Sequence, residues 1–150
     1  MDGLVKDVSP GNLMKDPATR NPAHDLIERA PFAAMLGLRI ESARQGESVV
    51  RLPFSPGLLN GGGPDVPIHG GAIASLIDVA ACAAIWSLPE TTRSATIAMT
   101  VNYTGPGISS DLIAQAKVRR SGRKVASLAV EVRDAQGNLV ADALVTYKIS

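Results

Sequence analysis

The sequence predicts an α+β domain in which an antiparallel sheet wraps around one long central helix, preceded by a shorter helix. Two observations lead to this fold class. Residues 68–86 form an apolar run interrupted by a single charged residue, Asp78, and the run is long enough for a helix of roughly four turns. Strand-like runs separated by turn residues follow it, and consecutive strands joined by tight turns favour antiparallel pairing.

The elements are predicted from residue spacing and from the positions of glycine and proline. They are a short helix over 24–36 that breaks at Pro31, strands over 37–43 and 47–54, a loop over 55–67, the long helix, and four strands in a meander over 94–103, 111–120, 123–133 and 139–149. Residues 121–122 and 134–138 have the composition of hairpin turns, which would join the last three strands. The apolar helix is expected to be enclosed on nearly every face.

The chain is expected to form one domain over 24–150, after a loose N-terminal arm over 1–23 that is rich in proline and polar residues. No signal peptide is apparent in the polar N-terminus, and the apolar run is too short and too interrupted for a membrane span. The only cysteine, Cys82, lies inside the apolar run and is expected to be a small buried residue. We therefore expect a soluble protein of the reducing cytoplasm.

The charge pattern argues against a nucleic-acid surface. The net charge is +1 and aromatic residues make up only 3% of the chain, whereas a nucleic-acid surface needs a broad basic stripe and stacking aromatics. Positive charge gathers only around 117–124.

The apolar helix combines two features that suit acyl transfer. An unpaired carboxylate in an apolar setting is costly, so Asp78 needs either a satisfying partner or a chemical task. The helix opens with His69-Gly70-Gly71, which leaves backbone N–H groups at its positive end. A buried acid and an anion-binding helix start are the ingredients of such a site.

Several short motifs, in this order and spacing, carry a resemblance to a known family. They are Pro31-Phe32 with Leu36-Gly37-Leu38, His69-Gly70-Gly71 with Asp78 nine residues after the histidine, Val101-Asn102-Tyr103 ahead of Pro106, and Arg120-Ser121-Gly122-Arg123. Over residues 26–149 the chain resembles the PaaI-type acyl-CoA thioesterases, which have the hotdog fold. The resemblance implies that Asp78 is the general base or nucleophile and that the Gly70 amide is the oxyanion donor.

The same resemblance implies roles for further residues. Asn60 is a candidate for the amide that orients water or the carbonyl, although the loop over 55–67, termed the glycine loop for Gly61-Gly62-Gly63, carries a short insertion relative to the family. Thr96 is expected to face the acid, and His69 either braces the helix start or contacts substrate. The residues expected to meet acyl-CoA are Gly71, Ser121, Gly122, Arg123 and Lys124.

The spacing on the helix predicts an oligomer. Asp78 lies eight residues after Gly70, so the two are about 12 Å apart along a helix and cannot both reach one thioester carbonyl from the same chain. If both act on it, the site is shared between two subunits with antiparallel helices across a two-fold axis, in a homodimer or in a homotetramer built from dimers. Such hydrolysis needs no metal or other cofactor.

Other interpretations remain open at this point. The domain could be a non-catalytic acyl-CoA-binding or regulatory hotdog module, or a hotdog dehydratase or hydratase. Asp78 could be a structural acid, Thr96 an ordinary strand residue, and Arg123 with Lys124 a solvated hairpin. His24 is expected to lie on the surface.

Overall fold

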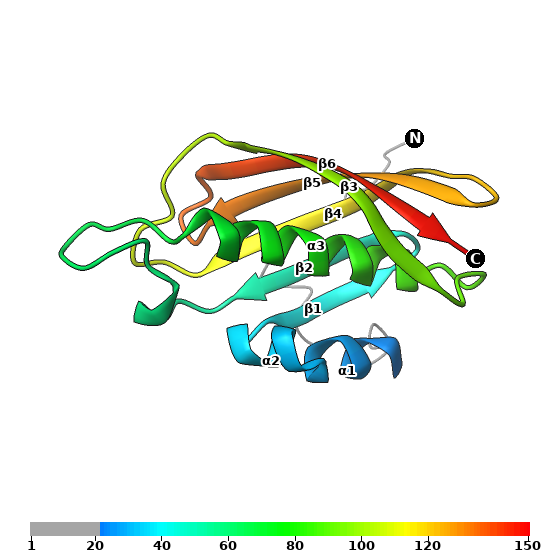
Figure 1. Ribbon diagram of the computed structural model, residues 1–150, viewed down its shortest axis with the longest axis horizontal. Helices are drawn as coiled ribbons and strands as arrows, with labels where there is room; N and C mark the ends of the chain where they lie inside the picture. Colours follow the sequence, from blue (N-terminus) through cyan, green and yellow to red (C-terminus); the bar gives the residue numbers. More distant parts are fainter. Residues whose placement is uncertain (1–21) are drawn as a thin grey trace, which may run out of the picture.

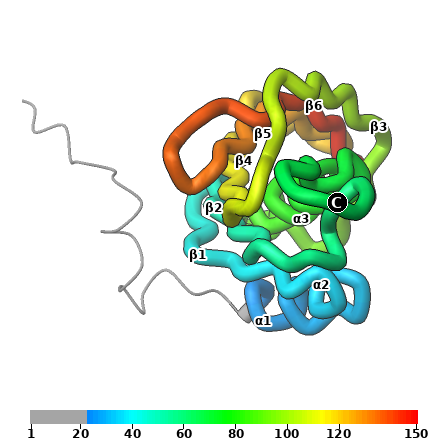
Figure 2. Tube along the Cα trace, turned by 90° about the vertical axis from the view of Figure 1, so that its left-hand side faces the viewer, coloured from blue at the N-terminus to red at the C-terminus, as the bar shows by residue number. Residues whose placement is uncertain are grey.

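The computed structural model describes residues 22–150, and it confirms the predicted architecture of an antiparallel sheet around one long helix (Figure 1). The elements are α1 (Pro22–Arg29), α2 (Pro31–Leu36), β1 (Arg39–Arg44), β2 (Glu47–Leu52), the 3-10 helix η2 (Pro56–Leu58), α3 (Gly70–Trp86), β3 (Ser94–Tyr103), β4 (Leu112–Ser121), β5 (Val125–Asp134) and β6 (Leu139–Ile149). The sheet curls around α3, while α1 and α2 lie beside it (Figure 2).

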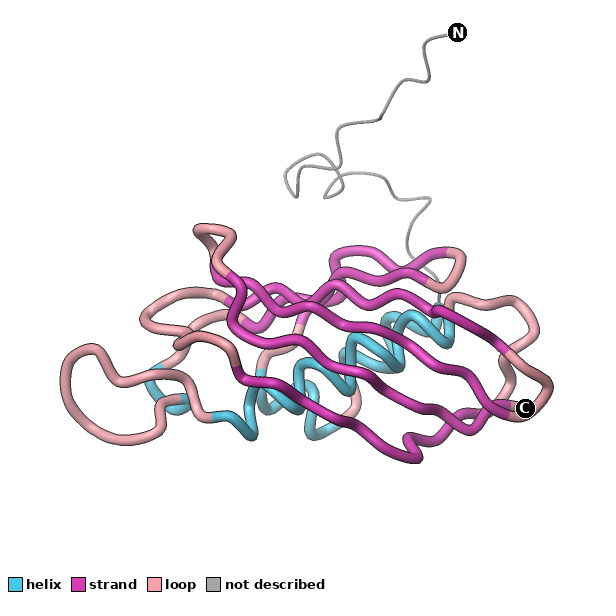
Figure 3. Tube along the Cα trace, turned by 90° about the horizontal axis from the view of Figure 1, so that it is seen from above, coloured by secondary structure: helices cyan, strands magenta, loops and turns pink. Residues whose placement is uncertain are grey.

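The six strands are ordered β1-β2-β4-β5-β6-β3, and every neighbouring pair is antiparallel. The predicted four-strand meander is therefore wrong for β3, which pairs with β6 at the edge of the sheet instead of with β4. Residues 104–111 join β3 to β4 as a connection rather than as a tight turn, and they carry the chain from the edge to the middle of the sheet. Figure 3, seen from above, shows the strands side by side over the long helix.

The first described helix, α1, begins two residues before the predicted helix over 24–36. The predicted arm, 1–23, lies outside the described residues except for Pro22 and Ala23, which belong to α1. The expectation that His24 lies on the surface is wrong, because its side chain is only 1% exposed. In residues 22–150 no helix has the length and apolar character that crossing a membrane requires.

One face of α3 forms the centre of the hydrophobic core. Its buried residues are Ile73, Leu76, Ile77, Ala80, Ala81, Ala83, Ala84 and Ile85. Their partners include the inward residues of β6, which are Ala141, Ala143, Val145, Tyr147 and Ile149, as the alternation predicted. The core thus fixes α3 in one rotational setting against the sheet.

A second face of α3 is not enclosed by the chain, so the expected burial on nearly every face is wrong. Gly71 is exposed, and Ser75, Asp78, Cys82 and Trp86 are only partly buried. These five residues, at helical spacing, form what we term the open stripe. The side chains of the open stripe are small apart from Trp86. The apolar composition of the helix predicted its enclosure, but composition does not tell which part of the protein covers this face. In a single chain β3 lies beside it.

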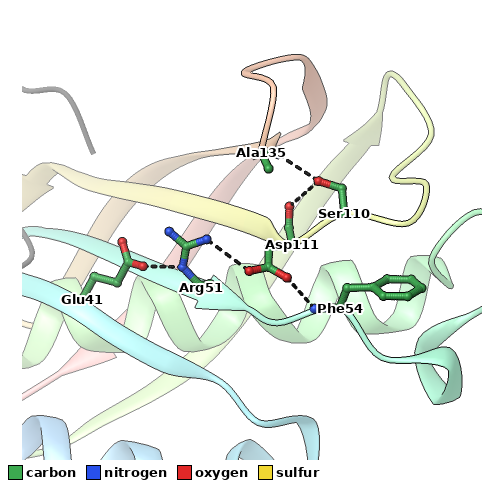
Figure 4. Close-up of polar contacts among 6 residues, drawn as sticks. All are labelled: Glu41, Arg51, Phe54, Ser110, Asp111 and Ala135. Atoms are coloured by element: carbon green, nitrogen blue, oxygen red, sulfur yellow. Dashed lines mark hydrogen bonds and ion pairs between the residues drawn. The ribbon is translucent and has the colours of Figure 1, made fainter. Parts of the chain in front are cut away.

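A polar network connects the end of β2, the segment before β4 and the turn between β5 and β6 (Figure 4). The Asp111 carboxylate accepts the Phe54 N–H at 2.8 Å and the Arg51 guanidinium at 3.2 Å, and Arg51 also pairs with Glu41. Ser110 donates to the Asp111 carbonyl oxygen and accepts the Ala135 N–H, both at 3.0 Å. The ends of β2 and β4 are thereby fixed to each other.

Candidate active site

The first turn of α3 is capped by His69. Its Nδ1 atom accepts the Gly71 N–H at 2.8 Å, and its carbonyl oxygen accepts the N–H groups of Ala72 and Ile73. An Nδ1 that accepts leaves the proton of a neutral imidazole on Nε2. His69 thus braces the turn through Nδ1, and its ring is exposed.

The Gly70 N–H has no acceptor anywhere in residues 22–150. It is the first N–H of α3, where the macrodipole places positive charge. The neighbouring N–H, that of Gly71, is occupied by His69. One backbone donor at this helix start is therefore available to an external acceptor.

The glycine loop is pinned at its base next to this helix start. Leu59 and Ile68 form an antiparallel bridge, the Asn60 N–H donates to the Pro67 carbonyl at 2.9 Å, and the His69 N–H donates to the Leu58 carbonyl at 2.8 Å. Asn60 therefore lies at the base of the loop with an exposed side chain. Within one chain it belongs to the Gly70 end of α3 rather than to the middle of the helix.

Asp78 lies in the middle of the open stripe and is half-buried. Its Oδ1 atom accepts the Thr96 hydroxyl at 2.7 Å and the Tyr147 hydroxyl at 2.8 Å. Thr96 thus faces the acid as expected. Tyr147 is a partner that the sequence did not predict; it lies opposite Thr96 in the β3–β6 pairing, which no local pattern in the sequence encodes.

Two neighbours of Asp78 are held in their protonated forms. Burial, with a contribution from the charge of Asp78, raises the pKa of the Cys82 thiol to about 11. Burial also raises the pKa of the Tyr147 phenol well above its ordinary value of 10.0. At neutral pH Cys82 is therefore a poor nucleophile, and Tyr147 is a hydrogen-bond donor.

The basic turn, defined as residues 121–124, lies at the other end of α3. The Gly122 N–H donates to the Val125 carbonyl at 2.9 Å, and the Lys124 carbonyl accepts the Ile149 N–H at 2.9 Å. Ile149 is opposite Ser94, whose hydroxyl accepts the indole N–H of Trp86 at the end of α3. The turn is exposed and lines a shallow surface depression with Arg120 and Ser127.

The site residues predicted from the sequence thus fall into three groups along α3. Asn60, His69, Gly70 and Gly71 gather at its start, Thr96 joins Asp78 at its middle, and the basic turn lies near its end. Among the described residues, no group of three or more His, Cys, Asp and Glu side chains is placed to hold a metal ion. Asp78 and the Gly70 N–H, which has no acceptor among the described residues, thus lie on one helix but not at one point.

Comparisons with known proteins identify the family of the chain. A family model described as the thioesterase superfamily matches residues 68–141. The acyl-coenzyme A thioesterase PaaI of Escherichia coli is 32% identical over 120 residues, which cover 79% of this chain and 82% of that protein. The medium/long-chain acyl-CoA thioesterase YigI of Salmonella typhimurium is 31% identical over 138 residues, covering 82% and 88%.

A solved structure extends the similarity to the fold. The structure of the E. coli PaaI protein from the phenylacetic acid degradation operon superposes with a TM-score of 0.77 at 29% identity, covering 85% of this chain and 90% of that one. Together with the sequence matches, this superposition fixes the family. The chain belongs to the thioesterase superfamily, within which it is a PaaI-type thioester hydrolase with the hotdog fold.

Proposed function

We propose that this chain hydrolyses acyl-CoA thioesters to the free acid and CoA in an active site shared by two subunits. Asp78 of one subunit acts as general base or nucleophile, and the Gly70 N–H of the other stabilises the oxyanion. One observation carries the proposal: the carboxylate and the unoccupied N–H belong to the same helix, eight residues and about 12 Å apart, which is too far for one carbonyl.

With Asp78 as base, the reaction balances without further reagents. The oxygen of a water molecule adds to the thioester carbonyl carbon while the carboxylate takes a water proton. The carbonyl oxygen becomes negative and accepts the Gly70 N–H, which can lower the barrier by about 3 kcal/mol. The C–S bond then breaks, and the CoA sulfur leaves with the proton that Asp78 received.

The remaining candidate residues support these two. The hydrogen bond from Thr96 to Asp78 suits a role in orienting the carboxylate, and the cap on Gly71 favours a bracing role for His69 over contact with substrate. We assign to Asn60 the orientation of the water or of the carbonyl that meets Gly70, and its position at the base of the glycine loop beside the helix start supports this role.

A dimer built on β3 would complete the site. β3 is an edge strand, and Ile97 and Tyr103 on it are 57% and 53% exposed. An edge with unpaired backbone groups readily pairs with another strand. Pairing of β3 with a second copy across a two-fold axis runs the two α3 helices antiparallel, which brings Gly70 of one chain toward Asp78 of the other and covers the open stripe.

We further propose that Ser121, Gly122, Arg123 and Lys124, together with Gly71, contact CoA. The turn is exposed and carries two adjacent cations that no described acidic group pairs, which suits the phosphates of CoA. Its backbone is fixed by the bonds to Val125 and Ile149, so it presents these groups at low entropic cost.

Free-thiol release from a panel of acyl-CoA esters tests the activity. The panel contains acetyl-CoA, an arylacetyl-CoA, a medium-chain and a long-chain ester, so that the preferred acyl class is measured as well. Asp78→Asn keeps the shape of the side chain and removes the base, and it should abolish release. If wild type releases no thiol from any ester, a non-catalytic acyl-CoA-binding module becomes the better account.

Subunit mixing tests the shared site. Asp78→Asn and Gly70→Pro chains are each expected to be inactive; unfolded together and refolded at equal amounts, they form mixed dimers with one intact and one doubly defective site. The mixture should regain roughly a quarter of wild-type activity, since half the dimers are mixed and half their sites are intact. A mixture as inactive as its components would place both groups in one chain and overturn the shared site.

A further inference from the structure

The two oxygens of the Asp78 carboxylate are unequal. Both side-chain donors, Thr96 and Tyr147, reach Oδ1, at 2.7 Å and 2.8 Å. No group in residues 22–150 donates to Oδ2. Among the described residues, Oδ1 therefore accepts two hydrogen bonds and Oδ2 accepts none, on the partly buried part of the open stripe.

This convergence is produced by an irregularity in β3. Thr96 and Tyr147 are opposite each other in the β3–β6 register, and the register shifts immediately afterwards, between Thr96 and Ala98. The extra residue, Ile97, is a β-bulge that re-aims the strand. Without it, Thr96 would point to the opposite side of the sheet from Met99, which packs on the core. The bulge thus turns the Thr96 hydroxyl toward the helix.

The second donor is held rigidly. The Tyr147 side chain is 2% exposed within the core, so its ring has one setting. Its single hydroxyl proton has two acceptors in reach, the Asp78 carbonyl oxygen at 3.0 Å and Oδ1 at 2.8 Å. The carboxylate is the nearer of the two, and a charged acceptor makes the stronger bond.

We infer that Tyr147 is a positioning residue which, with Thr96, fixes the carboxylate of Asp78 through Oδ1 and presents Oδ2 as the atom that meets water or the thioester carbonyl. The inference rests on the proposed function. A carboxylate held by two donors cannot rotate its reactive lone pairs out of line with the substrate. Catalysis depends on this alignment of the reacting atoms.

A merely structural role for Tyr147 makes a different prediction. Ser48 provides the comparison, because its buried hydroxyl donates to the Ala80 carbonyl at 2.7 Å, which is another bond from the sheet to α3 but one that involves no carboxylate. If Tyr147 only ties the sheet to the helix, Tyr147→Phe and Ser48→Ala should lower the melting temperature and affect turnover alike.

Steady-state kinetics on the best acyl-CoA, with melting temperatures measured in parallel, separate the two roles. Tyr147→Phe should lower kcat about tenfold and leave KM within about twofold, since only the alignment of the base changes. Ser48→Ala should keep kcat. A Tyr147→Phe enzyme with kcat within twofold of wild type, or with a loss that Ser48→Ala matches, overturns the inference.

A double-mutant cycle tests whether the two donors act on one oxygen. Thr96→Val removes the other hydroxyl at nearly constant volume. The Tyr147→Phe/Thr96→Val enzyme should fall at least about threefold below the product of the single effects, because each single variant keeps one donor that still partly aligns the carboxylate and the double variant keeps none. If the loss of kcat in the double variant equals the product of the two single losses, Thr96 and Tyr147 do not share a task.

Asp78→Asn separates this inference from the proposed function. If Asp78→Asn turns over at the wild-type rate, the proposed function fails and Tyr147 has no catalytic acid to position. If Asp78→Asn is inactive while Tyr147→Phe is unimpaired, the thioesterase proposal stands and the positioning role alone is wrong.

Discussion

The ring of Tyr103 lies over Gly70, and its hydroxyl donates to the Gly70 carbonyl oxygen at 3.0 Å. A Cβ atom added at Gly70 would meet that ring at 3.3 Å, a tight contact that a side chain as exposed as Tyr103 can relieve by a small shift. The last residue of β3 thus covers the first residue of α3. Substitutions that add a Cβ atom at Gly70 therefore meet the same contact with Tyr103, and their effects can be compared with one another.

Gly70→Pro should remove the proposed oxyanion donor without breaking the helix. Proline is tolerated at the first helical position, and the preceding residue, His69, already has the extended conformation (φ −59°, ψ 135°) that proline requires. We expect kcat to fall about 100-fold or more, as for loss of one oxyanion donor elsewhere.

Gly70→Ala is the matched control, because it adds the same Cβ beside Tyr103 and keeps the N–H. It should retain most of the activity. Equal losses in the two variants, measured by thiol release, would attribute the effect to crowding of Tyr103 and would count against the oxyanion role.

The His69 cap should be measurable as stability. His69→Ala leaves the Gly71 N–H without its acceptor and should lower the free energy of unfolding by about 1 kcal/mol. His69→Asn restores a side-chain acceptor at the N-cap and should recover most of that loss in urea denaturation. If His69→Ala unfolds at the wild-type urea concentration, the bond to Gly71 contributes nothing to the helix start.

Local patterns in the sequence predict the elements of this fold well, including the range of β3, but not the position of β3 in the sheet. The ranges of the long helix and of β4, β5 and β6 follow from periodicity and turn residues, which are local signals. The position of β3 beside β6 depends on a contact between segments far apart in sequence, and no local pattern encodes it.

The same distinction holds in the candidate site. Asp78 and the glycines at the helix start are conspicuous in the sequence because each departs from its apolar surroundings. Tyr147 looks like an ordinary core residue of an alternating strand, and its bond to Asp78 arises from register and from the bulge at Ile97. Alternation alone would place Thr96 on the opposite face from Met99, so the Ile97 bulge was not predictable from it.

The Asp111 network in Figure 4 should stabilise the domain more than an exposed ion pair does. Asp111→Ala leaves the Phe54 N–H without an acceptor and loses the contact with Arg51, so we expect a loss of about 1–2 kcal/mol. Glu131→Ala breaks only the exposed pair with Arg133 and should change stability by less than about 0.5 kcal/mol. Urea denaturation of both variants measures the difference, and equal losses would contradict it.

The basic turn should act on substrate affinity and not on chemistry. Arg123→Ala combined with Lys124→Ala should raise KM for acyl-CoA about 3- to 10-fold with kcat nearly unchanged, and the difference from wild type should shrink at high salt as exposed charges are screened. Lys117→Ala is the control, since Lys117 is exposed on the sheet and pairs with Glu47 at 2.8 Å. If Lys117→Ala raises KM as much as the Arg123→Ala/Lys124→Ala variant does, the basic turn is not part of the CoA site.

Cys82 should make the protein less stable in alkaline solution. An unfolded chain loses the thiol proton near its ordinary pKa of 9.0, whereas in the folded chain burial raises the pKa of Cys82 to about 11. Between these values the folded state binds more protons than the unfolded state, so the free energy of unfolding falls as pH rises. Below pH 9 the thiol contributes no pH dependence, and by pH 11 the loss is on the order of 2 kcal/mol.

Urea denaturation of wild type and Cys82→Ala at pH 8, 9, 10 and 11 isolates this contribution. Both proteins should lose stability above pH 10, because burial also raises the pKa of Tyr147 and the unfolded phenol ionises first. The difference between them should change only between pH 9 and 11, in the direction that favours Cys82→Ala. Parallel stability curves over that range would show that the open stripe does not shield the thiol from water.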